Sequence, residues 1–102
     1  MKKALVFVNG EQAGILVEKD DATFSFSYDQ DYQGEPISLT MPKDKNVYEF
    51  NKFPPFFDGL LPEGFELEAL LKNYKIDRYD YFTQMVTVGA DLVGAVTVKE
   101  IE

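Results

Sequence analysis

The sequence has 102 residues, with no cysteine and no histidine, and its 18 acidic and 10 basic side chains give a formal net charge of −8 at pH 7. This length fits one domain, spanning residues 1–102. Without cysteine the chain can form no disulfide and no thiolate, and without histidine it lacks the commonest general base and metal ligand. We therefore expect neither a metal nor a cofactor. The acidic charge repels nucleic-acid phosphates, and the apolar runs are too short for a membrane helix or a signal peptide, so we expect a cytoplasmic location without direct nucleic-acid or membrane partners.

The N-terminal segment predicts a β-hairpin. Residues 3–8 are β-branched and aromatic enough for a strand that is buried on both faces. Asn9 and Gly10 then provide the two positive-φ positions that a type I′ turn requires, and residues 13–17 return as the partner strand.

A third strand and two shorter candidates follow the hairpin. Residues 23–28 alternate strictly, so that one face packs and the other meets solvent, which extends the hairpin to an antiparallel meander. The packed face carries Phe24, Phe26 and Tyr28. Residues 37–41 are a candidate short strand that ends at Pro42, and residues 47–50 are another.

The middle of the chain changes from a rigid aromatic segment to a helix. The proline pair in residues 53–57 fixes φ, so this segment is partly ordered before it packs. Helical periodicity begins at Pro62, which is suited to a first helical position. The stripe expected to face the core consists of Leu67, Leu70, Leu71 and Tyr74.

A second helix and a last strand complete the expected fold. The helix has Asp77 as its N-cap and Asp80 in its first turn, and it ends at Gly89. Its inward side chains are Phe82, Met85 and Val86. Residues 94–99 predict a final strand, so the fold class is α+β, with a small antiparallel sheet packed with two α-helices.

Phe65 is set apart by the helical phase. At 100° per residue it lies about 170° away from the core-facing stripe, so it should point outward. One interpretation is an irregular first turn in which Phe65 folds back onto Phe56 or Phe57 as a hydrophobic staple. The other is an exposed aromatic anchor that enters a pocket of a partner.

Motifs for catalysis or ligand binding are incomplete. Residues 29–34 begin like a calcium loop, but the twelfth position is Thr40 instead of a bidentate glutamate. Residues 89–94 lack the lysine and the hydroxyl of a phosphate-binding loop. Glu66 and Glu68 point to different sides of a helix, which is typical of a solvated face, and we expect no catalytic residue.

Three segments together resemble the N-terminal domain of HipA-type serine/threonine kinase toxins. They are residues 55–64 (PFFDGLLPEG), 76–82 (IDRYDYF) and 88–96 (VGADLVGAV), and the resemblance spans nearly the whole chain. The chain ends at residue 102 without the His-Arg-Asp and Asp-Phe-Gly motifs of a kinase core, so we expect that it is not a kinase by itself.

Within this family the sequence is most similar to the HipS-type antitoxins of tripartite HipB-HipS-HipT operons. The resemblance implies a non-catalytic protein that binds and neutralises a HipT-like kinase and meets a HipB-like DNA-binding subunit only through the complex. It implies that the turn after Leu-Leu-Pro-Glu-Gly faces the kinase active site, and that the aromatic residue after this turn, tryptophan in some relatives, is inserted there. The residues that it assigns to the kinase contact are Phe57, Asp58, Pro62, Glu63, Gly64 and Phe65.

Other functions remain open at this point. The chain could instead be a structural subunit that stabilises the kinase complex without inhibiting it. A carboxylate-dependent enzyme would need two buried carboxylates that converge in one pocket. An acidic mimic of nucleic acid would need carboxylates spaced like phosphates on one face.

Overall fold

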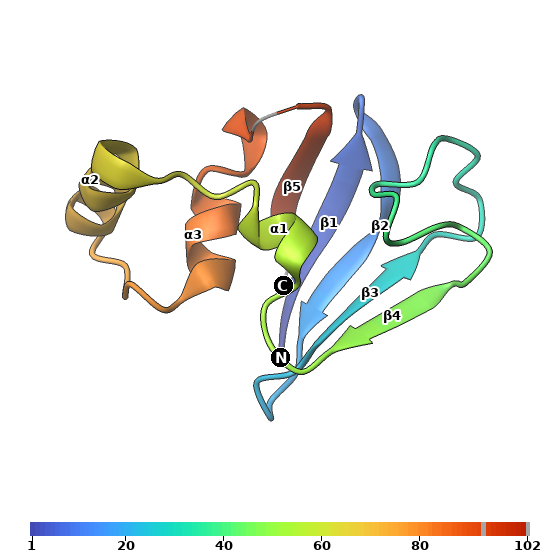
Figure 1. Ribbon diagram of the computed structural model, residues 1–102, viewed down its shortest axis with the longest axis horizontal. Coiled ribbons are helices and arrows are strands. Elements are labelled where there is room, and N and C mark those ends of the chain that lie inside the picture. The colour runs from blue at the N-terminus through green and yellow to red at the C-terminus, as the bar shows by residue number, and fades with distance from the viewer. Residues whose placement is uncertain (93, 102) are drawn as a thin grey trace.

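The computed structural model describes residues 1–92 and 94–101. Across these residues, five strands form one antiparallel sheet in the order β4-β3-β2-β1-β5 (Figure 1). The strands are β1 (Lys2–Val8), β2 (Glu11–Glu18), β3 (Phe24–Tyr28), β4 (Val47–Phe50) and β5 (Val96–Ile101). β5 comes last in the sequence but pairs with β1, with Val6 opposite Val98.

The predicted hairpin and meander are confirmed. Asn9 and Gly10 have φ values of 51° and 83°, as the type I′ turn requires. The prediction that the first strand is buried on both faces is wrong, because Ala4 and Val6 are fully buried whereas the alternating Leu5 and Phe7 are only partly so. β1 therefore has one core face, like an ordinary strand of an antiparallel sheet.

The helices differ from the prediction in number and in bounds. They are α1 (Pro55–Asp58), α2 (Gly64–Tyr74) and α3 (Tyr81–Thr87), followed by the 3-10 turn η1 (Gly89–Asp91). α1 was not predicted as a helix, although its proline at the first helical position is a known start signal. α2 begins two residues after Pro62, because Glu63 is still extended, with φ −130° and ψ 165°.

The cap of α3 is Asp80 and not Asp77. The Asp80 carboxylate accepts a hydrogen bond from the Thr83 N–H at 3.2 Å, which satisfies a free donor of the first turn. The helix also ends earlier than predicted, at Thr87, and Gly89 begins η1. The inward direction of Phe82, Met85 and Val86 is confirmed, since all three belong to or pack against the core.

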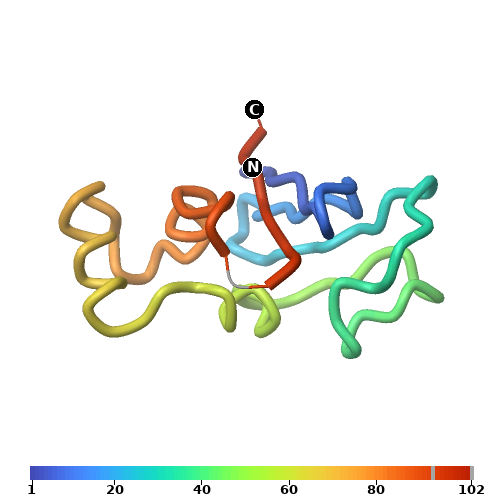
Figure 2. Tube along the Cα trace, turned by 90° about the horizontal axis from the view of Figure 1, so that it is seen from above, coloured from blue at the N-terminus to red at the C-terminus, as the bar shows by residue number. Residues whose placement is uncertain are grey.

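Aromatic rings from the sheet and from α1 form the centre of the core. Figures 1 and 2 show α1 lying over one face of the sheet. Phe57 of α1 is fully buried, and its ring centroid lies 6.0 Å from that of Phe26 in β3. Phe53 packs edge-on against Phe24 at 5.4 Å. The rigid aromatic segment therefore belongs mostly to the core.

The loop between β3 and β4 replaces the short strand predicted for residues 37–41. The Tyr28 hydroxyl accepts a hydrogen bond from the Ile37 N–H at 3.0 Å and donates one to the Met41 carbonyl at 2.5 Å. Ile37 and Met41 are buried. The apolar residues that suggested a strand thus anchor an irregular loop to the sheet.

α2 lies outside α3, at the end of the molecule far from β4, in both views (Figures 1 and 2). Leu70 is buried, although it is not part of the main cluster of core residues, and Tyr74 is 64% exposed. The prediction that the apolar stripe faces the core is therefore confirmed for Leu70 and wrong for Tyr74. In residues 1–92 and 94–101 we find no helix with the length and apolar character needed to cross a membrane.

Candidate functional site

The start of α2 projects an aromatic side chain into solvent. Phe65 is 95% exposed, which agrees with its helical phase. It does not fold back as a staple, since Phe56 instead packs edge-on against Phe57 at 5.2 Å. We call Pro62, Glu63, Gly64 and Phe65 the tip.

The backbone of Gly64 produces this projection. Its φ of +58° lies in the left-handed region, and a Cβ atom added there would meet nothing within 4 Å. Glycine is therefore required by the backbone conformation and not by close packing. As the first residue of α2, directly after the extended Glu63, Gly64 redirects the chain so that Phe65 lies on the outer side of the first turn.

The six residues assigned to the kinase contact are not equivalent. Glu63, Gly64, Phe65 and Asp58 are exposed, and Pro62 is partly buried. Phe57 has no exposed surface, so it has no side-chain area to offer a partner. Its place in the contact set is corrected to a supporting one: it packs α1 into the core, directly before the segment that leads to the tip.

A shallow hollow separates the start of α2 from the segment that precedes and begins α3. Its volume is about 300 Å³. On the side of the tip it is lined by Asp58, Leu61, Pro62, Glu63 and Leu67, and on the other side by Arg78, Tyr79, Tyr81 and Gln84. The segment that carries the tip is thus open toward solvent on this side.

An ion pair spans from α2 to the loop before α3. The guanidinium of Arg78 donates two hydrogen bonds to the carboxylate of Glu68, at 2.7 and 2.9 Å. These hydrogen bonds from Arg78 lower the pKa of the Glu68 carboxyl group below its ordinary value. Sequence reasoning missed this pair, because ten residues separate its members and only the chain reversal after α2 brings them together.

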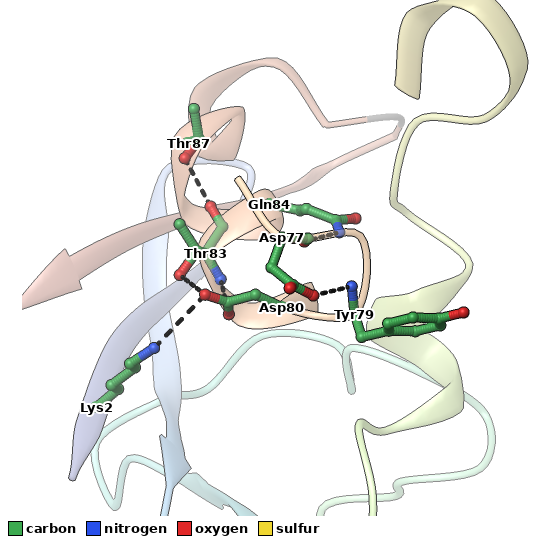
Figure 3. Close-up of polar contacts among 7 residues, drawn as sticks. All are labelled: Lys2, Asp77, Tyr79, Asp80, Thr83, Gln84 and Thr87. Atoms are coloured by element: carbon green, nitrogen blue, oxygen red, sulfur yellow. Dashed lines mark hydrogen bonds and ion pairs between the residues drawn. The ribbon is translucent and has the colours of Figure 1, made fainter. Parts of the chain in front are cut away.

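The loop that carries Arg78 is itself fixed to α3 (Figure 3). Gln84 is 1% exposed, and its side-chain amide donates hydrogen bonds to the carbonyls of Asp77 at 3.2 Å and Arg78 at 2.9 Å. The Asp77 carboxylate accepts the Tyr79 N–H at 2.8 Å. The two aspartates of the segment 76–82 therefore serve a turn and a helix cap.

The same network also reaches β1. Besides capping α3, the Asp80 carboxylate accepts a hydrogen bond from the Thr83 hydroxyl at 2.7 Å, and it lies 3.8 Å from the Lys2 ammonium (Figure 3). The start of α3 is thereby tied to the first residue of β1, an interior strand of the sheet. The distinctive sequence of this segment has a structural explanation in these contacts.

Two further exposed aromatic side chains were not predicted. Tyr74, at the end of α2, is 64% exposed, and Tyr79, in the following loop, is 75% exposed. Tyr74 was assigned to the core because it continues the apolar stripe of the helix. Its exposure becomes evident only from the position of α2 outside α3, where the Tyr74 side chain is left largely exposed to solvent.

The described residues offer little for catalysis. In the described part of the chain, Gln84 is the one buried polar or charged side chain, so no pair of buried carboxylates converges there. Likewise, no group of three or more acidic residues in that part could hold a metal ion.

In the 89–94 segment, a Cβ at Gly89 would lie 2.2 Å from the Val98 carbonyl oxygen, so this glycine permits close packing against β5.

Comparison with known proteins gives consistent matches along the chain. The family model of the HipA N-terminal domain matches residues 4–99. A protein of Haemophilus influenzae described as uncharacterized is 35% identical over 100 residues, which cover 98% of this chain and 93% of that protein.

Two solved structures have the same fold. The structure titled the N-terminal domain of HipA toxin superposes with a TM-score of 0.79 and 31% identity, and the match covers all of this chain and 94% of the other. A HipA chain in a Shewanella oneidensis complex of HipA, HipB and operator DNA has a TM-score of 0.75 and 24% identity. That match covers 94% of this chain but only 23% of the HipA chain.

Proposed function

The chain belongs to the HipA N-terminal domain family, and from that premise we propose that it is a non-catalytic, HipS-type antitoxin that binds and neutralises a HipT-like serine/threonine kinase toxin. The contact surface is the tip together with Asp58. A HipB-like DNA-binding subunit meets the chain only through the complex.

The exposure of Phe65 carries this proposal. A phenylalanine that is 95% exposed gains almost no free energy from burial in the unbound protein and adds nothing to the hydrophobic core. Buried aromatic side chains are the commonest anchors of protein interfaces, and truncating one typically costs about 2 kcal/mol or more of binding free energy. The side chain is thus available to a partner at no cost to the fold.

The proposed mechanism is obstruction. Inserted into the nucleotide-binding or substrate-binding region of the kinase, the ring of Phe65 occupies space that a substrate needs. Gly64 carries no side chain beside this ring, so it lets the partner approach the backbone closely. The net charge of −8 accelerates encounter with a basic cleft, but adds less to the affinity than the buried ring.

The experiment has two steps. First, the tagged chain is used to capture its kinase from its own cell, and the kinase is identified. Second, the activity of this kinase is measured against increasing concentrations of the wild-type chain, of Phe65→Ala and of Leu39→Ala. Leu39 is a matched control, because it is 98% exposed and lies in the loop between β3 and β4, at the other end of the molecule from α2 (Figure 1).

We expect Phe65→Ala to raise the concentration needed for half-inhibition at least about tenfold, equivalent to ~1.4 kcal/mol, and Leu39→Ala to leave it unchanged. Equal inhibition by Phe65→Ala and the wild type would overturn the mechanism. A wild-type chain that binds the kinase without inhibiting it would support the alternative of a structural subunit. Capture of no kinase at all would overturn the proposed function.

A further inference from the structure

We propose that Arg78 is a positioning residue for the tip, and that its ion pair with Glu68 sets the direction in which α2 presents Phe65. The consequence for kinase binding rests on the proposed function above. The positioning itself is a property of this chain alone and can be measured without a kinase.

α2 needs such a constraint because the core does not supply one. Leu70 is the one buried side chain of α2, it is not part of the main cluster of core residues, and the helix lies beyond α3 at the end of the molecule (Figures 1 and 2). The hollow of about 300 Å³ lies between the start of this helix and the segment around α3. Close packing, which normally fixes the direction of a helix, is therefore incomplete on this side of α2.

The Glu68–Arg78 pair has the geometry to provide the constraint. Two parallel hydrogen bonds between the planar guanidinium and the carboxylate restrict both distance and orientation, as a single lysine contact would not. Glu68 lies three residues after Phe65, which is less than one helical turn. A restraint on Glu68 therefore acts directly on the turn that carries the exposed ring.

The other end of the pair is firmly attached to the core. The buried amide of Gln84 holds the backbone carbonyl of Arg78 at 2.9 Å, and the neighbouring Phe82 and Met85 of α3 are core residues. The connection thus runs from the core through Gln84 and Arg78 to Glu68, and from there to the tip. In the described part of the chain, it is the one ion pair that joins α2 to another segment.

The absence of cysteine from the sequence allows a direct test by electron–electron distance measurement. Spin labels are attached at Tyr74→Cys in α2 and at Val47→Cys in β4, two exposed positions on elements at opposite ends of the molecule (Figure 1). The distance distribution is recorded for this labelled pair alone, with Arg78→Glu, and with the charge swap Glu68→Arg/Arg78→Glu. Lys99→Glu, an exposed substitution in β5 with the same change of charge, is the matched control.

We expect a single narrow distance peak with the native pair and with Lys99→Glu. In Arg78→Glu this peak should be replaced by a broad or shifted distribution, and in the charge swap it should return. Thermal unfolding should be nearly unchanged in all variants, because the pair lies outside the core. An unchanged peak with Arg78→Glu would overturn the inference. So would a broad distribution that the charge swap fails to narrow, since the positioning would then not act through Glu68.

Binding to the captured kinase gives the second readout. Arg78→Glu should speed dissociation about tenfold, and the charge swap should restore the slow rate, because most changes within one interface appear in the off-rate. Fast dissociation that persists in the swap, with the narrow distance peak restored, would show that Arg78 contacts the kinase directly; it would overturn the inferred consequence for kinase binding, while the positioning through Glu68 would stand. A wild-type chain that captures no kinase overturns the proposed function. The distance measurement is independent of that outcome, because it tests only whether the Glu68–Arg78 pair positions α2.

Discussion

Phe57 and Phe65 lie eight residues apart in the sequence and at opposite extremes of exposure, 0% and 95%. The ring of Phe57 packs against those of Phe26 and Phe53, with centroids at 6.0 and 6.5 Å. Phe65 lies in the first turn of α2, a helix whose one buried side chain, Leu70, is outside the main core cluster. Within one aromatic-rich segment, the first phenylalanine therefore serves folding and the second is free for binding.

The first prediction follows from this contrast. Phe57→Ala should lower the free energy of unfolding by about 3–5 kcal/mol, because it removes a fully buried ring and leaves a cavity. Phe65→Ala should change it by no more than ~0.5 kcal/mol, as expected for an exposed side chain. Denaturant titrations of the two variants measure both values. A loss of several kcal/mol in Phe65→Ala would contradict the exposed position of this side chain.

The second prediction concerns Gly64. Alanine at its φ of +58° should cost about 1–2 kcal/mol, since a Cβ is strained in the left-handed region. The loss should appear as faster amide hydrogen exchange in α2, while the strands keep their protection, because α2 lies outside the core.

Gly59→Ala is the matched control for this substitution. Gly59 has a φ of −67°, and an added Cβ would make ordinary contacts at 3.5 and 3.6 Å. Alanine there should be neutral or slightly stabilising. If the two variants have the same exchange rates in α2, the left-handed backbone is not what shapes the tip.

Local patterns were sufficient to predict the N-terminal meander and the outward direction of Phe65. Strict alternation in residues 23–28 and the Asn9-Gly10 turn depend on nearest neighbours along the chain, and both are confirmed, with the strand observed at Phe24–Tyr28. The helical phase of Phe65 is also local, because it requires only the apolar stripe of the same helix. The α+β class followed from these elements without any knowledge of how they pack.

What the sequence did not predict depends on contacts between distant segments. An apolar stripe shows which face of a helix is covered, but not by what, so α2 was wrongly placed on the sheet and Tyr74 in the core. Two aspartates spaced by three residues both fit a helix cap, and only the hydrogen bond to Thr83 distinguishes Asp80 from Asp77. The Glu68–Arg78 pair likewise depends on a chain reversal that no local pattern specifies.

The third prediction concerns Tyr28. Tyr28→Phe should lower the free energy of unfolding by about 1–3 kcal/mol, because the Ile37 N–H and the Met41 carbonyl lose a buried partner. Denaturant titration at neutral pH measures this loss. Tyr48→Phe is the control, since its hydroxyl bonds to Pro42 at an exposed position and its removal should cost less.

The same hydroxyl predicts how stability changes at alkaline pH. Burial raises the pKa of Tyr28 above its ordinary value of 10.0. The folded state therefore holds this proton more tightly than the unfolded state, so its contribution to stability is complete below pH 10 and is lost as the pH rises through the raised value. Wild-type stability should fall above pH 10, and this fall should be smaller in Tyr28→Phe; an equal fall in both proteins would rule out Tyr28 as its source.

The fourth prediction tests why the segment 89–94 contains glycine. A Cβ at Gly89 would lie 2.2 Å from the carbonyl oxygen of Val98, a backbone atom that cannot move without disturbing the pairing of β5 with β1. Gly89→Ala should therefore cost about 1–3 kcal/mol or more through overpacking, measured by thermal or denaturant unfolding. Ala90→Ser, at the exposed neighbouring position, should change the stability by only ~0.5 kcal/mol. A Gly89→Ala variant as stable as the wild type would mean that this glycine does not serve close packing, and its role would then have to be sought outside the fold.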